Sequence, residues 1–247
     1  MATFDPTSGY RRLDSWIMAS IVHFATFRFC KKFLTQKLDP TGRQYDQMTQ
    51  AARSGKVNIV EGSARSATSK ETEMKLTDVA RASLNELVSD YEDWLLRQGL
   101  VPWHINSEEA KAVFAVWLDR PDYKDDWVYE SCVHLLKQQS KFDQWLLSDN
   151  SITVANCLII LIRRTMKMLA GQLQTQVDTF EREGGFRERL TQIRTEAKAK
   201  KENAPACPNC GKPMTMRKAT TGRNAGKEFW GCTGYPECKC VMNVEKK

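Results

Sequence analysis

The sequence predicts a mainly α-helical protein, an up-and-down four-helix bundle with an inserted helical hairpin, followed by a small β-domain. Three observations predict this class. Between residues 11 and 185, long stretches repeat apolar side chains at the period of an amphipathic helix. Residues 99–150 interrupt that pattern with shorter helical stretches. From residue 205 onward, turn-forming residues and short alternating stretches replace the helical period.

Capping and turn residues delimit the first three bundle helices. The first begins near Asp14 and ends before Asp39-Pro40-Thr41-Gly42, and the second covers about residues 43–65. The third opens at Thr68-Ser69-Lys70-Glu71, which has the form of a capping box, and it ends at Gln98-Gly99.

The fourth bundle helix begins after Asn150-Ser151 and ends at Gly184-Gly185. Before it, the insertion 99–150 has helical patches at residues 107–118 and 127–147. Four of the seven tryptophans lie in this insertion: Trp103, Trp117, Trp127 and Trp145. Such aromatic density favours packing of the hairpin onto the bundle, and a partner-binding groove is the alternative. A charged helix and tether at 186–204 then lead to the domain at 205–247.

The second bundle helix carries a stripe of small residues that would let another helix approach closely: Ala51, Ser54, Gly55, Asn58 and Gly62. Each internal glycine costs about 1 kcal/mol of helix propensity. We therefore expect close packing of another helix against this stripe to offset that cost. Asn58, Glu61 and Arg65 follow at i, i+3 and i+7, and we expect them to tie helices together through a polar network.

Three segments of the predicted bundle carry a resemblance: A-A-R-S at 51–54, N-I-V-E-G-S-A-R at 58–65 and S-L-N-E-L at 83–87. They resemble the four-helix-bundle family of ribosomal-RNA intervening-sequence proteins and diversity-generating-retroelement accessory proteins. The resemblance covers residues 11–98 and, more weakly, 151–183. It implies a ring-like homopentamer whose basic surfaces bind nucleic acid and, in retroelement members, a reverse transcriptase. It also implies structural roles for five residues: Asn58, Glu61, Gly62, Arg65 and Glu86.

Four cysteines near the C-terminus have the spacing of a metal site. Cys207 and Cys210 form a C-x-x-C pair, and Cys232 and Cys238 form a second close pair. Two such turns present four thiolates, which close the tetrahedral shell of one Zn²⁺ and leave no position for water, so the metal is expected to be structural. Disulfides of a secreted domain are the alternative. Cys240 competes with Cys238 as fourth ligand, and iron competes with zinc.

The residues around these cysteines carry a second resemblance. C-P-N-C-G-K-P-M at 207–214 and E-F-W-G-C-T-G-Y-P-E-C at 228–238 resemble the four-cysteine zinc ribbon at the C-terminal end of bacterial type I DNA topoisomerases. The resemblance covers about residues 205–244. It implies that Cys207, Cys210, Cys232 and Cys238 are the ligands and that the ribbon binds single-stranded DNA. Cys240 stands where an aromatic residue is common in that family.

The charge of the C-terminal segment favours a nucleic-acid partner. The chain has 37 Lys and Arg against 30 Asp and Glu, and residues 196–247 hold 11 basic and 5 acidic side chains. Phosphate attraction combined with base stacking is the usual mode of single-strand binding. The candidate contacts are Lys212, Arg217, Lys218, Arg223, Lys227, Phe229, Trp230, Tyr235 and Lys239. For the aromatic residues, covering the metal is an equally good interpretation.

Several function classes find no support in the sequence. The three histidines fall in different segments, and neither a phosphate-binding glycine loop nor a counterpart of the topoisomerase catalytic domain is present. The longest apolar run, residues 152–162, is too short to span a bilayer. We therefore expect a cytoplasmic, non-catalytic nucleic-acid-binding protein, single-stranded DNA being favoured over RNA, with a reverse transcriptase or other protein as partner. A protein-interaction scaffold using the Trp-rich insertion is the alternative, and a DNA-processing enzyme comes third.

Overall fold

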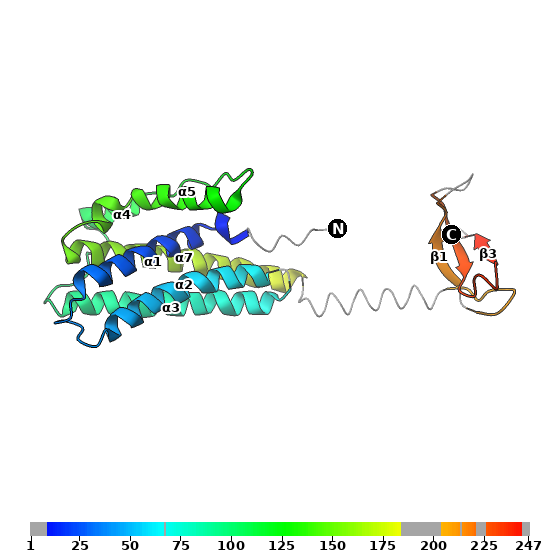
Figure 1. The fold of residues 1–247 in the computed structure, drawn as a ribbon, viewed down its shortest axis with the longest axis horizontal. Coiled ribbons are helices and arrows are strands. Elements are labelled where there is room, and N and C mark those ends of the chain that lie inside the picture. Colours follow the sequence, from blue (N-terminus) through cyan, green and yellow to red (C-terminus); the bar gives the residue numbers. More distant parts are fainter. Residues whose placement is uncertain (1–8, 67, 184–203, 213, 221–225, 244–247) are drawn as a thin grey trace. The chain divides into compact units, whose positions relative to one another are not determined.

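Helices account for most of this computed structural model, which describes residues 9–66, 68–183, 204–212, 214–220 and 226–243. The chain divides into two units, Met1–Gly185 and Phe186–Lys247. The first unit is helical, and the second carries a three-stranded antiparallel sheet (Figure 1). The predicted mainly helical class with a small C-terminal β-structure is confirmed.

Four long helices form the body of the helical unit: α1 (Asp14–Phe33), α2 (Arg43–Arg65), α3 (Lys70–Leu96) and α7 (Ser151–Glu183). Helix α1, preceded by the 3₁₀ turn η1 (Gly9–Arg12), packs against α2 and α7, and α3 packs against the same two helices. Their apolar faces meet in one core, in which Ile17, Leu84 and Leu158 are fully buried. All four helices end within a few residues of their predicted positions.

The start of α3 differs from the predicted capping box by one residue. Ser69, and not Thr68, is the N-cap, because its Oγ accepts the N–H of Thr72 at 3.2 Å. Thr68 instead belongs to the preceding turn, where its N–H donates to the carbonyl of Arg65. The box at Thr68–Glu71 was therefore wrong in register, because a glutamate three residues after Thr68 favoured that threonine although serine is the better cap.

The small residues of α2 lie where this helix meets α3. Ala51, Gly55 and Gly62 are buried, and a Cβ on Gly62 would rest in ordinary contact with Leu76 Cβ at 3.5 Å. At Gly55 the approach of α3 is closer still. The stripe thus lets α2 and α3 pack closely, as the sequence predicts.

The insertion forms three helices that cover α1 and α7: α4 (Glu108–Phe114), α5 (Trp127–Ser140) and α6 (Asp143–Leu146). In Figure 1 this layer lies on the side of α1 and α7 that faces away from α2 and α3. Trp103 and Trp145 pack against the core, and the N–H of Trp103 donates to Asn156 Oδ1 at 2.6 Å. Trp117 is 78% exposed. Packing of the insertion on the long helices therefore explains the positions of Trp103 and Trp145 but not that of Trp117.

The C-terminal unit contains β1 (Met214–Lys218), β2 (Glu228–Cys232) and β3 (Val241–Asn243), with β2 in the centre. Strands β1 and β2 fall within the short alternating stretches that the sequence predicts after residue 205, and they pair with Met216 opposite Trp230. Strand β3, which places Met242 on the other side of Trp230, was not predicted, because three residues are too few to show an alternating pattern.

No helix in the described part of the chain is both long and apolar enough to cross a membrane.

Candidate metal centre

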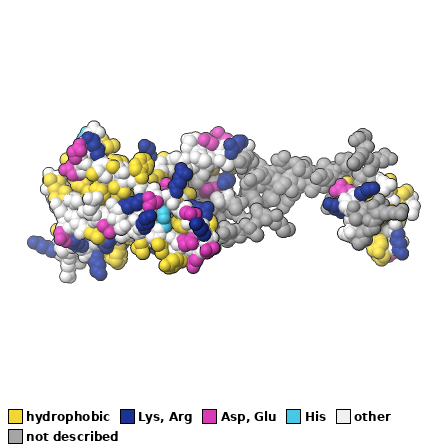
Figure 2. All heavy atoms as spheres, turned by 90° about the horizontal axis from the view of Figure 1, so that it is seen from above, with side chains coloured by type: hydrophobic (Ala, Val, Ile, Leu, Met, Phe, Trp, Pro, Cys, Tyr) yellow, Lys and Arg dark blue, Asp and Glu magenta, His cyan; other side chains and the backbone are white. Residues whose placement is uncertain are grey.

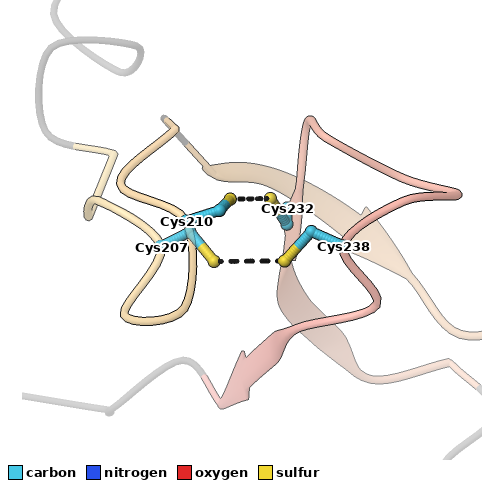
Figure 3. A group of neighbouring side chains, drawn as sticks. All are labelled: Cys207, Cys210, Cys232 and Cys238. Atoms are coloured by element: carbon cyan, nitrogen blue, oxygen red, sulfur yellow. Dashed lines mark hydrogen bonds between the residues drawn. The ribbon is translucent and has the colours of Figure 1, made fainter.

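Four cysteines of the C-terminal unit converge on one point. Cys207 and Cys210 lie in the turn before β1, Cys232 ends β2, and Cys238 lies in the loop before β3 (Figure 3). The two turns face each other, so their sulfur atoms all lie within 4.8 Å of one another. Residues that are 31 positions apart in sequence are thereby brought to one site, as the spacing of the cysteines predicts.

The distances between the sulfur atoms fit a tetrahedral metal ion. The Sγ atoms of Cys210 and Cys232 are 3.3 Å apart, and those of Cys207 and Cys238 are 3.7 Å apart. A disulfide would bring two sulfurs to about 2.05 Å, and all eight cysteines are free thiols. Zinc–sulfur bonds of about 2.3 Å imply sulfur–sulfur edges of about 3.8 Å in a tetrahedron. The disulfide alternative is therefore wrong, and the four cysteines can hold a metal ion.

Two sulfur contacts link the thiols of this cluster, Cys210 with Cys232 and Cys207 with Cys238. Burial acts to raise the pKa of Cys207, but hydrogen bonds from the N–H groups of Asn209 and Cys210 and from neighbouring thiols outweigh it and lower the pKa to about 6. The N–H of Cys240 and the thiol of Cys232 act to lower the pKa of Cys238, but hydrogen bonds with Cys210 and Cys207 together with burial outweigh them, so this pKa is raised. The Cys207 thiolate therefore forms readily, and a bound cation would favour the thiolate of Cys238 as well.

Cys240 lies beside this cluster without being part of it. It packs against the small apolar core formed by Cys207, Met214 and Cys232. Its carbonyl oxygen accepts the N–H of Cys232, which joins the metal turn to β3. Its sulfur does not belong to the group of four that share the 4.8 Å limit. The geometry thus favours Cys238 as the fourth ligand.

The sheet has one face toward the cysteines and one face away from them. Residues directly opposite each other in paired strands share a face. Met214 lies opposite Cys232, both are buried, and the half-buried Trp230 packs against them. Trp230 thus lies on the cysteine cluster, as the alternative interpretation of this tryptophan expects.

The outer face of the sheet carries a different set of side chains. Arg217 lies opposite Phe229, and Thr215 lies opposite Gly231. A Cβ on Gly231 would be 3.1 Å from Arg217 Cδ and 3.6 Å from Phe229 Cε2, so the arginine stem crosses the glycine beside the phenyl ring. Arg217 is exposed and Phe229 is half-buried. An arginine and an aromatic ring are thereby paired on an open surface.

A second cation lies beside a second exposed aromatic residue near the metal turns. A Cβ on Gly234 would be 3.2 Å from Lys212 Cδ, so the lysine stem rests on the loop that carries Tyr235. Tyr235 is 61% exposed. Of the remaining predicted contacts, Lys218, Lys227 and Lys239 are exposed, and Lys218 lies across the strands from Glu228. Arg223 lies outside the described residues.

The polar residues predicted to tie the long helices together lie mostly on the surface. Glu61, Arg65 and Glu86 are exposed, and Asn58 is half-buried. No hydrogen bond or ion pair joins their side chains in the part of the chain that the structure describes. Only Gly62 of this set is buried, between α2 and α3.

Cationic side chains of the helical unit fall into two groups. Arg163 pairs with Glu92 at 2.7 Å, and the half-buried Arg164 donates to the carbonyls of Val113 and Val116 at 3.1 and 2.8 Å. These two arginines stabilise the fold. By contrast, four cations of α1 and α2 form no ion pair with any residue that the structure describes: Arg28, Lys31, Arg53 and Lys56.

The Lys56 ammonium group lies 5.3 Å from the ring of Phe24, which is 37% exposed. Phe24 is not among the site residues that the sequence predicts. An aromatic residue facing outward from α1, four positions from Arg28, is the signal that could have found it.

No family model, no curated protein and no solved structure matches this chain.

Proposed function

We propose that this protein binds nucleic acid through its C-terminal unit, a zinc ribbon held together by one structural Zn²⁺. The observation that carries the proposal is the convergence of four cysteine sulfurs within 4.8 Å behind a sheet whose outer face pairs Arg217 with Phe229. Cys207, Cys210, Cys232 and Cys238 would hold the ion. A bound Zn²⁺ would cross-link the two turns and would thereby stabilise a unit whose own apolar core is small.

The outer face of the sheet suits single-stranded DNA better than a duplex. Phe229 offers a ring on which a base can stack, and the neighbouring Arg217 offers charge for a phosphate. Tyr235 and Lys212 repeat this pairing near the metal turns. Stacking of this kind is open to any unpaired base, so RNA single strands are the alternative ligand.

For the helical unit, we propose an up-and-down four-helix bundle that mediates oligomerisation or binds a protein such as a reverse transcriptase. Its support is that each of α1, α2, α3 and α7 packs against two of the others. The unpaired cations of α1 and α2 are a second candidate surface for nucleic acid. Repetition of this surface in an oligomer would multiply a weak interaction.

Fluorescence anisotropy of labelled single-stranded DNA, duplex DNA and structured RNA at two salt concentrations tests the proposal. The full chain, loaded with zinc, should bind the single strand best, and its affinity should fall steeply with salt. Phe229→Ala should weaken binding about tenfold, since one stacked base contributes about 1–3 kcal/mol. Met216→Ala is the matched control, because Met216 is an exposed apolar residue on the other face of the same sheet, opposite Trp230.

Two double variants separate the two candidate surfaces. Cys207→Ser/Cys210→Ser should abolish binding if the ribbon is the site, whereas Arg53→Glu/Lys56→Glu should leave it nearly unchanged. The reverse result would move the site to α1 and α2. Absence of binding by the zinc-loaded wild-type chain would refute the proposal.

A further inference from the structure

The outward side of α5 is apolar. Five neighbouring side chains form what we call the α5 stripe, and all are exposed: Val128, Tyr129, Cys132, Val133 and Leu136. Tyr129, Val133 and Leu136 follow at i, i+4 and i+7, so they share one face of the helix. Tyr129 is 67% exposed and Leu136 is 64% exposed. Figure 2 views the helical unit from the side of α4 and α5, and hydrophobic side chains gather over this surface.

The inward side of α5 is bound to the helical unit mainly by polar contacts. Ser131 Oγ accepts a hydrogen bond from Arg11 at 2.7 Å, and Gln138 Oε1 accepts the N–H of Asp119 at 2.8 Å. Both residues are buried, with Leu135 between them. A surface helix usually has apolar side chains inward and polar side chains outward, and α5 partly inverts this arrangement. Contiguous apolar exposure of this kind marks an interaction surface.

The charges along α5 are arranged with opposite signs at its two ends. Asp125, Asp126 and Glu130 lie at the N-terminal end, and none of them forms an ion pair with a described residue. Glu130 instead accepts the N–H of Lys124, which precedes the helix, and Asp126 accepts the N–H of Val128 at the helix start. At the C-terminal end, Lys137 and Lys141 share one carboxylate, Asp119, at 3.3 and 2.7 Å. An acidic end and a basic end flank the apolar stripe.

We propose that the α5 stripe binds the same stripe of a second copy of this chain, with the two helices antiparallel about a two-fold axis between Cys132 and Val133. In that register Tyr129 of each copy lies opposite Leu136 of the other. The acidic end of each helix then lies beside the basic end of its partner. The surface is therefore complementary to itself, because apolar side chains meet apolar side chains and each acidic end meets a basic end. A closed two-fold contact is also the commonest form of homo-oligomer.

The contact is expected to be reversible. One helix pair buries less than the about 1,600 Å² of a standard stable interface, so we expect a dimer that forms at micromolar concentrations. Trp117 can extend the patch, because its carbonyl oxygen accepts Lys141 Nζ at 2.9 Å, which places this exposed residue beside the C-terminal end of α5.

Sedimentation velocity of the full, zinc-loaded chain over a concentration series tests the proposal. The wild type should pass from monomer to dimer, and Leu136→Glu should remain monomeric because each dimer would bury two unpaired carboxylates. Val101→Glu is the matched control, since Val101 is 74% exposed and lies outside α5. Circular dichroism of both variants checks that they remain folded.

Cross-linking gives a second measurement that does not depend on a variant. A short bifunctional maleimide should produce a Cys132–Cys132 link, which peptide mass spectrometry identifies and which can join only two different chains. Cys30 and Cys157 are buried and provide an internal control. A monomer at every concentration, or an oligomer that is insensitive to Leu136→Glu and lacks this link, would overturn the proposal. Neither result bears on the ribbon, whose nucleic-acid binding is measured separately.

Discussion

Gly55 of α2 lies so close to Leu84 of α3 that a Cβ on residue 55 would be 2.7 Å from Leu84 Cδ2. Leu84 is fully buried and cannot turn aside into solvent. Gly55→Ala should therefore force α2 and α3 apart and destabilise the protein by about 1–3 kcal/mol, against a gain in helix propensity of about 1 kcal/mol. Urea unfolding followed by circular dichroism measures the balance.

Gly171 in α7 is the matched control for this prediction. A Cβ there meets no atom within 4 Å. Gly171→Ala should raise the free energy of unfolding by about 0.5–1 kcal/mol, because only the helix propensity changes. Equal effects of the two substitutions would show that α2 and α3 are not in close contact at Gly55.

Two adjacent arginines of α7 should differ sharply in their effect on stability. Arg164→Ala removes two hydrogen bonds to the backbone at the end of α4, so we expect a loss of about 2–3 kcal/mol. Arg163→Ala removes an exposed pair with Glu92 and should cost less than about 1 kcal/mol. Thermal and urea unfolding of both variants would compare them, and similar losses would contradict the roles assigned to these side chains.

The stability of the helical unit should fall as the solution becomes acidic. Burial and the neighbouring Lys56 and Arg53 lower the pKa of His23, and burial also lowers the pKa of His134. The unfolded chain keeps the ordinary pKa of about 6.5, so it takes up protons first as the pH falls, and the free energy of unfolding decreases below about pH 6.5.

A variant of His23 isolates its share of this pH dependence. His23→Leu removes a ring whose buried Nδ1 has no hydrogen-bond partner among the described residues, and it should flatten the stability curve between about pH 7.5 and 5.5. His134→Leu should flatten the curve in the same range, because burial lowers the pKa of His134 as well. A slope that is the same in the wild type and in both variants would contradict the prediction.

The metal centre should depend on Cys238 and not on Cys240. Cys238→Ser removes one of the four converging sulfurs, so the purified chain should lose most of its zinc and the chelator PAR should extract the remainder rapidly. Cys240→Ser should keep one zinc per chain, measured by plasma emission spectrometry. Zinc loss in the Cys240 variant with retention in the Cys238 variant would reverse the assignment of the fourth ligand.

Local features of the chain were accessible to prediction because they depend on local sequence. The ends of α1, α2, α3 and α7 follow from periodicity, glycines and prolines, since caps and turns are set by a few neighbouring residues. The cysteine cluster followed from spacing, because each turn presents its two thiols independently of the rest of the chain. The polar network of Asn58, Glu61 and Arg65 did not follow, since helical spacing places these residues near one another without showing what faces them.

The sequence by itself determined the helical class, the long helices and the four cysteines that can hold a metal, because periodicity and spacing are written into short segments. Only the tertiary structure decided which face of each element is used. It turned Trp230 toward the cysteines and Phe229 away from them, because strand pairing sets the faces of the sheet. It also placed Ser131 and Gln138 inward and the α5 stripe outward. The physical reason is that burial depends on contacts between distant segments, here Arg11 with Ser131, which no local pattern encodes.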